Sequence, residues 1–328
     1  MNEKRYKEVY SQIMEVYKHV LLHTEDGERA LNYLFERGFT LETIERFNFG
    51  YSFKGNMITK FLQSKGYDLE EMVEIGILRK FDKEPIYRDF FYGRIMIPIC
   101  DIDDATIGFS GRVLPNNTTP IKYLNTVETA YFKKGQILYN LHNAKSSIKQ
   151  NNFCILVEGY FDANMVAQKV SDNVVATMGT ALTLEQVYQL KQYTNRVIIC
   201  FDGDSAGIEA TKRNAEILLQ NGFDVRVAVI PNEYDPHEFL MKNEKEMFIS
   251  QIIGKAKSYY SFMMNYLKNG KDMSLEINRL VYINEMLKVI QLAPYEKGKE
   301  LFVHLTHEMN IDYNWINYYL DYFLSVEK

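Results

Sequence analysis

Acidic side chains follow three short apolar runs of the chain, each at the point where a strand should end. The acids and the runs before them are Glu158 after Phe153–Val157, Asp202 and Asp204 after Arg196–Phe201, and Asp235 after Val225–Ile230. Helix-like segments separate the runs, which is the alternation of a parallel α/β sheet. Because the carboxyl ends of parallel strands share one edge of such a sheet, we expect these acids to meet in space.

Several carboxylates in one cleft repel each other at neutral pH unless a cation neutralises them. Carboxylate oxygens suit Mg²⁺, which binds through a few protein oxygens, several waters and the phosphates of a substrate, and Mn²⁺ is the alternative metal. The pattern therefore favours metal-dependent phosphoryl transfer without a covalent nucleophile. Taken singly, each acid could instead be a helix cap or a turn residue, as Asp202 and Asp204 are beside Gly203.

The acids and their neighbours resemble a known family. Glu158–Asp162, Asp202-Gly203-Asp204 and Asp235-Pro236 are similar to the Toprim domain of bacterial primases, topoisomerases and some nucleases. Further motifs resemble the RNA-polymerase core of the DnaG-type bacterial primase; they are Leu31–Leu34 with Arg37-Gly38, Arg94–Ile99, Gly108–Leu114, Lys122–Asn125 and Phe132–Gly135. The resemblance covers residue 31 to about residue 240.

The resemblance implies roles for individual residues. Catalysis is expected at Glu158, Asp202 and Asp204, and these three with Asp235 are expected to hold the metal. Asp162 would support them from outside the metal's own ligands. Residues of the primase motifs that would bind template or nucleotide are Arg94, Arg112, Lys122, Tyr123, Asn125 and Lys134. Which of these meets template and which meets triphosphate stays open.

One position departs from the family pattern. His237 stands two residues after Asp235, where the family commonly has a second acid. Imidazole is a poorer ligand for Mg²⁺ than carboxylate is, and a better one for transition metals such as Mn²⁺. We therefore assign Asp235 to the metal and leave open whether His237 or Glu238 contributes.

The fold class expected is α/β, with a Toprim parallel sheet flanked by an N-terminal mixed α+β subdomain and a C-terminal helical subdomain. The expected boundaries are 1–150, 151–254 and 255–328. The last part has Tyr, Phe and Met at helical spacing, at Tyr259, Phe262, Met263 and Tyr266 and again at Trp315, Tyr318, Tyr319 and Tyr322. Such spacing is more typical of a helical core than of a surface that stacks on single-stranded bases.

Local signals place several element ends. Thr183 with Gln186 forms a capping box for a helix that ends near residue 193. Thr40 is a suitable N-cap for a helix over 41–47, which Gly50 should close. The segment 24–27 should separate two N-terminal helices, and Asp103-Asp104 should form a hairpin turn.

Composition limits the classes of protein. The 328 residues are 46% hydrophobic and 25% charged, which is enough for two or three packed units. No run of eighteen apolar residues and no signal peptide is found, so we expect no membrane contact and a cytoplasmic protein. Cys100, Cys154 and Cys200 have no metal-site or paired spacing, so neither zinc nor a disulfide is expected.

The net charge of −5 does not by itself favour nucleic-acid binding, but the charge is unevenly distributed. Residues 79–150 hold eleven Lys and Arg against seven Asp and Glu, a local net charge of +4, so the rest of the chain carries −9. A basic segment beside an acidic metal cleft suits an enzyme that grips phosphates on one side and metal on the other. An ordinary solvated surface is the alternative.

Taken with the resemblance, these features predict a primase core, a DNA-directed RNA polymerase that makes short RNA primers during replication. Its expected partners are a single-stranded DNA template, ribonucleoside triphosphates and the RNA–DNA primer duplex. The zinc-binding and helicase-binding domains of the family are not found, so we expect an excised central core that would meet the replicative helicase only through the absent domain. Alternatives are a Toprim nuclease and a non-catalytic DNA-binding scaffold; a topoisomerase is disfavoured because no catalytic tyrosine is identified.

Overall fold

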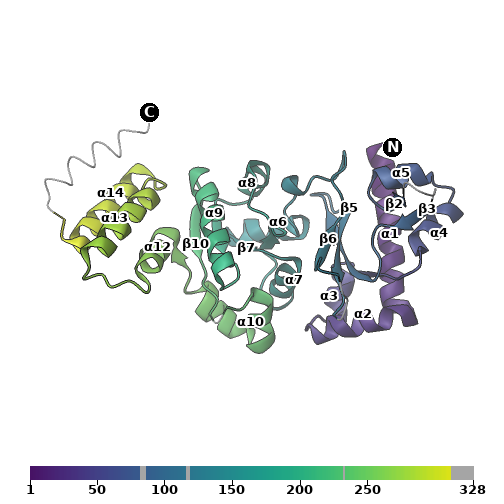
Figure 1. Ribbon diagram of the computed structural model, residues 1–328, viewed down its shortest axis with the longest axis horizontal. Helices are drawn as coiled ribbons and strands as arrows, with labels where there is room; N and C mark the ends of the chain where they lie inside the picture. Colours follow the sequence, from purple (N-terminus) through teal and green to yellow (C-terminus); the bar gives the residue numbers. More distant parts are fainter. Residues whose placement is uncertain (82–85, 116–118, 232, 312–328) are drawn as a thin grey trace.

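The computed structural model of the chain describes residues 1–81, 86–115, 119–231 and 233–311. It has three parts in a row along its long axis (Figure 1): an N-terminal mixed α+β part, a central part built on a parallel sheet, and helices at the C-terminal end. The α/β class and this order of parts confirm the fold predicted from the sequence. The exact boundaries at residues 150 and 254 stay predictions.

The N-terminal part combines helices with an antiparallel sheet. Its helices are α1 (Glu3–His23), α2 (Glu25–Glu36), α3 (Leu41–Arg46), α4 (Met57–Ser64), α5 (Leu69–Glu74) and the 3₁₀-helix η1 (Lys134–Gln136). Helix α6 (Leu141–Asn151) follows them and packs on the parallel sheet of the central part. The strands of the N-terminal part are β1 (Gly50–Ser52), β2 (Leu78–Phe81), β3 (Ile86–Asp89), β4 (Arg94–Cys100), β5 (Thr106–Val113) and β6 (Tyr123–Asn125). The main sheet has the order β1-β4-β5-β6, and β2 pairs with β3 separately. The predicted hairpin turn at Asp103-Asp104 lies between β4 and β5.

Two predicted element ends in this part are wrong. The break between the first two helices is a single residue, Thr24, whose side chain caps α2, so residues 25–27 already belong to that helix. Gly27 lies against α1 so closely that a Cβ there would come 2.1 Å from the Val20 carbonyl oxygen, which explains why a glycine is needed inside the helix. Thr40 does cap α3, but the helix ends at Arg46 and Gly50 begins strand β1 instead of closing the helix.

The central part is a five-stranded sheet with the order β11-β10-β9-β7-β8. Strands β7 (Cys154–Val157), β8 (Val174–Ala176), β9 (Arg196–Ile199) and β10 (Asp224–Val227) are parallel, and β11 (Lys257–Ser258) is antiparallel to β10. The helices are α7 (Tyr160–Lys169), α8 (Leu184–Lys191), α9 (Ser205–Gln220), α10 (Pro236–Lys242), α11 (Lys245–Met247) and the π-helix η2 (Phe248–Ile253). The three strands predicted to precede the acids, β7, β9 and β10, are therefore confirmed. The capping box of Thr183 and Gln186 begins α8 as predicted.

Both faces of the parallel sheet are covered, which is why its strands are uninterrupted apolar runs. Ile155 and Val157 of β7 point into a core shared with the N-terminal helices and with α7, while Cys154 and Leu156 point into a second core. The second core includes residues of α8, α9 and the C-terminal helices. Because the first core continues into the N-terminal part, packing fixes that part against the sheet edge where the acids lie.

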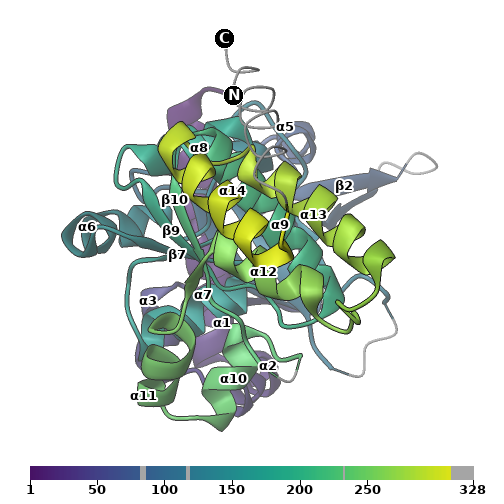
Figure 2. The same cartoon turned by 90° about the vertical axis from the view of Figure 1, so that its left-hand side faces the viewer.

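The C-terminal part consists of α12 (Tyr259–Lys268), α13 (Glu276–Ile290) and α14 (Tyr295–Met309), which lie at the end of the molecule away from the N-terminal part (Figures 1 and 2). Tyr259, Phe262 and Met263 are buried in the second core, as predicted for packing. The predicted aromatic group from Trp315 to Tyr322 lies outside the described residues. Among the residues that the structure describes, no helix has both the length and the apolar character needed to cross a bilayer.

Candidate active site

A cleft of about 380 Å³ lies where the N-terminal sheet meets the carboxyl ends of the parallel strands. Its walls come from β6 and η1 on one side and, on the other, from the turn after β7, the end of β9 and the start of α10. The charged residues that line it are Glu158, Asp162, Asp202, Asp235, Glu238, Arg37, Arg112, Lys122 and Lys134. Acids from three segments of the sequence and bases from the first 134 residues thus face one space.

Glu158 and Asp202 are the central acids of this cleft. Glu158 Oε1 and Asp202 Oδ1 are buried and have no hydrogen-bond partner. Burial raises the pKa of Asp202 to about 7, with the charges of Glu158, Asp235 and Asp204 adding to the effect. Burial also raises the pKa of Glu158, although an amide hydrogen bond from Asp202 opposes it. Two buried carboxylate oxygens without donors are groups that a cation would satisfy.

Asp204 and Asp235 each cap a helix with one carboxylate oxygen. Asp204 Oδ1 accepts from the amide of Gly207 at 2.7 Å, and Asp235 Oδ1 accepts from the amide of Glu238 at 2.6 Å. From the sequence, helix capping and metal binding were alternative roles for these acids. In the structure, capping uses one carboxylate oxygen of each residue, so the other oxygen remains for a metal. Asp235 lines the cleft, whereas Asp204 does not.

Asp162 stabilises the acidic side of the cleft through hydrogen bonds to backbone amides. Its carboxylate accepts from the amide of Gly159 at 3.1 Å and from the amide of His237 at 3.3 Å, so it connects the turn after β7 to the start of α10. The residue is 7% exposed. Burial, with the charges of Asp235 and Asp202, raises the pKa of Asp162 to about 8. Asp162 thus connects two segments that carry cleft acids, and its predicted supporting role stays a prediction.

The donor set fits a divalent cation bound partly through water. Among the described residues, no three of these carboxylates bring ligand oxygens within 4.8 Å of one another. Like charges spread apart without a cation, and Mg²⁺ needs only one or two protein carboxylates because it keeps several waters and takes phosphate oxygens. The unpartnered oxygens of Glu158 and Asp202 are the ligands best placed to hold it.

The basic wall is built on β5, β6 and η1. Arg112 donates to Tyr33 Oη at 2.9 Å and to Tyr123 Oη, and its guanidinium lies 4.4 Å from the ring centre of Phe161. Lys134 is half-buried, and this burial lowers its pKa. Lys122 lines the cleft beside these groups. Together the three cations line the same cleft as the carboxylates.

Tyr123 and Asn125 also line the cleft, from strand β6. Burial raises the pKa of Tyr123 to about 12, so its hydroxyl stays protonated at neutral pH. Asn125 Oδ1 accepts from the hydroxyl of Tyr160 at 2.9 Å, which joins β6 to the first turn of α7. These contacts fix the basic wall relative to the acidic one.

Arg94 is not part of the cleft. It is 7% exposed, and its guanidinium donates to the carbonyl oxygens of Gly111 at 2.9 Å and Ile121 at 3.1 Å. The structure therefore separates Arg94 from the other predicted binding residues and gives it a different task. Its hydrogen bonds hold the segment before β6, which carries Lys122, next to strand β5.

Two lining residues, Arg37 and Gly179, were not assigned from the sequence. Arg37 Nη2 donates to His237 Nδ1 at 2.9 Å, and His237 Nε2 donates to the Arg37 carbonyl oxygen at 2.8 Å. His237 is 1% exposed, and burial with the nearby charge of Arg37 lowers its pKa to about 3, so the ring is neutral. Both ring nitrogens face Arg37, so His237 joins two parts of the chain and is not free to bind a metal.

Gly179 has a φ of +78° in the loop between β8 and α8, and a Cβ there would meet no atom within 4 Å. The loop thus needs glycine for its backbone conformation and leaves open space on the cleft side. Its amide donates to the Glu158 carbonyl oxygen at 3.3 Å. The Arg37-Gly38 motif was the one sequence signal that pointed to Arg37.

Comparison with known families matches two parts of the chain. Residues 17–145 match the model described as DNA primase catalytic core, N-terminal domain, and residues 155–240 match the Toprim-like model. The first match contains the basic wall, and the second contains all four predicted metal ligands. The two models therefore meet at the cleft.

Individual relatives agree with these matches. The DNA primase of Geobacillus stearothermophilus is 40% identical over 288 residues, which are 88% of this chain and 47% of that protein. The E. coli primase catalytic core is 31% identical with a TM-score of 0.80, over 93% of this chain and 98% of that one. A DnaG primase catalytic domain bound to single-stranded DNA is 30% identical with a TM-score of 0.81, over 94% and 96%. The chain spans about half the length of the curated relatives it matches.

Proposed function

Because this chain belongs to the family of DnaG-type primase catalytic cores, we propose that it polymerises ribonucleotides on a single-stranded DNA template and so makes short RNA primers for replication. The observation that carries the proposal is the single cleft in which Glu158, Asp202 and Asp235 face Arg112, Lys122 and Lys134. Such an arrangement suits nucleotidyl transfer, where phosphate charge must be neutralised and reactants held in line.

Proteins of the Toprim primase family generally use divalent metal ions. We assign the metal here to Mg²⁺, with Mn²⁺ as an alternative, and name Glu158, Asp202, Asp204 and Asp235 as the residues that would hold it. When bound, the metal would activate the primer's 3′-hydroxyl and neutralise the departing pyrophosphate. The protein's own contribution is to place these carboxylates, and the hydrogen bonds of Asp162 hold together the segments that carry Glu158 and Asp235.

The basic wall performs the second task. Arg112, Lys122 and Lys134 supply positive charge for the triphosphate and for the template backbone, and Arg112 is pre-oriented by its two tyrosine contacts. Tyr123 and Asn125 offer a hydroxyl and an amide beside them. The proposed partners are a single-stranded DNA template, ribonucleoside triphosphates and the growing RNA–DNA duplex, and a place in the cytoplasm follows from this activity. We assign no contact with a replicative helicase to these residues.

The test uses single-stranded DNA, labelled ribonucleoside triphosphates and Mg²⁺ or Mn²⁺, with products resolved by length. The wild-type protein should give labelled RNA longer than a dinucleotide, and the Glu158→Gln variant should lose at least about 99% of this product, as expected when a metal-site carboxylate is removed. Glu216→Gln, on the exposed face of α9, is the matched control and should keep it.

The other outcomes contradict the proposal in distinct ways. Cleavage of the DNA without extension would indicate a Toprim nuclease. Binding of DNA without any product, in a protein whose acids hold no Mg²⁺, would indicate a scaffold. Full primer synthesis by Glu158→Gln would show that the acidic edge is not the catalytic centre.

A further inference from the structure

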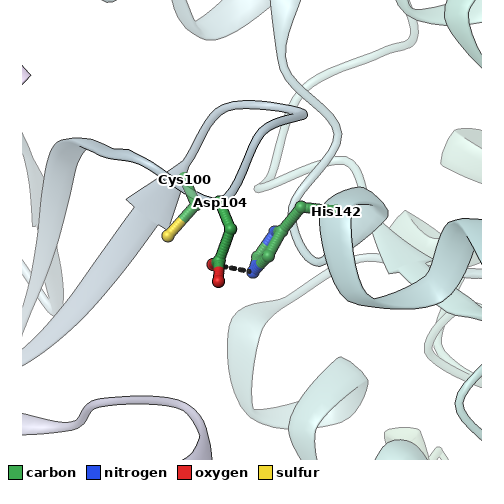
Figure 3. A group of neighbouring side chains, drawn as sticks. All are labelled: Cys100, Asp104 and His142. Atoms are coloured by element: carbon green, nitrogen blue, oxygen red, sulfur yellow. Dashed lines mark ion pairs between the residues drawn. The ribbon is translucent and has the colours of Figure 1, made fainter.

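Three side chains outside the cleft form a cluster of metal-ligating type (Figure 3). Cys100 ends strand β4, Asp104 lies in the β4–β5 turn, and His142 is in the first turn of α6. Their ligand atoms, one from each residue, all lie within 4.8 Å of one another, and no other group of three or more in the described part of the chain does so. His142 Nε2 is 3.3 Å from Asp104 Oδ1.

These distances are close to those of a tetrahedral metal site. Zn²⁺ binds thiolate at about 2.3 Å and imidazole or carboxylate at about 2.0–2.2 Å, so its ligand atoms lie about 3.3–3.7 Å apart. The Asp104–His142 pair already has this spacing, and the largest separation in the cluster exceeds it by only about 1 Å. Asp104 lies on a turn and its side chain is 74% exposed, so small movements there could close the difference.

The donor types select a class of metal. A thiolate, an imidazole and a carboxylate together suit Zn²⁺ and Co²⁺, whereas Mg²⁺ prefers oxygen ligands only. We propose that Cys100, Asp104 and His142 form a Zn²⁺-type transition-metal site, separate from the acidic cleft. Three protein ligands leave a fourth position, and a cavity of about 400 Å³ that Cys100 and His142 line gives room for water there.

Metal binding requires a deprotonated Cys100 and a His142 ring whose Nε2 lone pair faces the metal. His142 Nδ1 is buried and has no hydrogen-bond partner, so a ring proton moved there from Nε2 would lack an acceptor, and coordination of Nε2 must outweigh that cost. Nε2 would then turn its lone pair to the metal. Burial raises the pKa of the Cys100 thiol to about 12, so the thiol keeps its proton until a metal displaces it.

The site joins two parts of the chain. Cys100 and Asp104 belong to the hairpin whose second strand carries Arg112, and α6 leads into β7, which ends at Glu158. Without a metal, the hairpin turn is held to α6 by the Asp104–His142 contact and by Lys145 Nζ, which donates to the Ile102 carbonyl oxygen at 2.7 Å. A bound metal would replace the first contact with coordination bonds and so tighten the junction between the basic wall and the parallel sheet.

From the sequence, no zinc is expected, because the three cysteines do not have the spacing of a zinc site. That criterion finds sites made of neighbouring cysteines, but here a single cysteine is completed by an acid four residues later and a histidine forty-two residues later. The fold brings these three residues together at the β4–β5 hairpin and the start of α6. A rule based on spacing along the sequence cannot find such a site. The proposal does not depend on the primase activity.

Co²⁺ is the probe, because a thiolate bound to it gives a charge-transfer absorption that oxygen ligands do not give. The full chain is treated with a chelator, kept reduced without added thiols, and titrated with Co²⁺ in excess Mg²⁺. We expect one thiolate-bound Co²⁺ per chain, displaced by Zn²⁺ and not by Mg²⁺. Zn²⁺ should also raise the Tm of the protein.

Variants locate the site. Cys100→Ser should abolish the charge-transfer band, and Asp104→Asn should weaken Co²⁺ binding by roughly tenfold or more, since even outer partners of metal ligands cost about that much. Asp104 has a φ of +68°, which asparagine also tolerates, so this variant should fold. His304→Ala, an exposed histidine of α14, is the control and should bind as the wild type does. No band at all, a band that survives in Cys100→Ser, or unchanged affinity in Asp104→Asn would overturn the proposal.

Discussion

Replacing Asp202 by asparagine should stabilise the metal-free protein, although it removes a proposed metal ligand. The folded chain holds Asp202 beside Glu158 and Asp235, and its pKa rises from 3.8 to about 7. Each pKa unit corresponds to about 1.4 kcal/mol, so full expression of the difference would be about 4 kcal/mol. Water reaches the open side of the cleft and screens the charges, so we expect about 2 kcal/mol of stabilisation by Asp202→Asn.

The sign of the pH dependence follows from which state binds the proton more tightly. The folded state has the higher pKa, so between pH 3.8 and about 7 it holds a proton that the unfolded state has lost. Stability of the wild type therefore falls as pH rises through this window and levels off above it. Because asparagine does not ionise, the advantage of the variant should be largest near pH 8 and should shrink as the pH falls toward 4.

The assay is thermal and denaturant unfolding of both proteins in EDTA at pH 8 and pH 5, repeated with Mg²⁺. At pH 8 without metal, the variant should unfold about 3 °C higher than the wild type. At a free concentration about 100 times its dissociation constant, Mg²⁺ should raise the free energy of unfolding of the wild type by about 2.7 kcal/mol. It should stabilise the variant much less. Asp103→Asn, at an exposed turn position, is the control and should shift neither measurement.

Two results would refute this reasoning. If Asp202→Asn unfolds at a lower temperature than the wild type in EDTA, then Asp202 stabilises the fold and the acids are not held against their repulsion. If Mg²⁺ stabilises the variant as much as the wild type, the cation does not bind through this carboxylate.

Three further substitutions separate the roles of the surrounding residues. Arg112→Lys keeps the charge but loses the two-tyrosine fork, so KM for nucleotide or template should rise roughly tenfold, about 1.4 kcal/mol, in steady-state primer assays. Arg94→Lys should instead lower the free energy of unfolding by about 2 kcal/mol and raise KM less than Arg112→Lys does, because its hydrogen bonds go to backbone carbonyls and it reaches the cleft only through the segment that carries Lys122. His237→Asp should destabilise the metal-free protein by about 3 kcal/mol, since it breaks both bonds to Arg37 and adds a buried charge; denaturant titration measures this, and an unchanged midpoint would contradict the interpretation.

The acidic half of the site could be predicted because its residues follow a rule that sequence carries. Glu158 and Asp202 each come directly after an apolar strand, and parallel topology then determines that these ends are neighbours. The short strand β8 was not identified, because three residues, Val174–Ala176, give no periodic signal of their own. β8 lies at the sheet's edge beyond β7, and the loop that follows it brings Gly179 to the cleft, so missing this strand also left Gly179 out of the predicted site.

The basic half was harder to predict, because motif membership does not say which way a side chain points. Arg94 and Arg112 both lie on strands of one antiparallel sheet and both are buried. The neighbours across the sheet decide between them: Arg94 is drawn to the carbonyls at the Ile121 segment, and Arg112 to the tyrosines at the cleft. Those neighbours are set by strand register, which the sequence pattern alone does not give.

His237 shows how an unusual residue can be explained only by its partners. From the sequence it was a family acid replaced by a possible ligand, and metal chemistry was the natural way to consider it. In the structure both of its nitrogens are engaged by Arg37, two hundred residues earlier in the chain. An acid at the same place would lie beside Asp162, whose pKa is already raised to about 8 by burial and by Asp235 and Asp202. A neutral imidazole therefore removes one charge from the repulsive group and, at the same time, connects the helix that carries Asp235 to the N-terminal part that carries the cations.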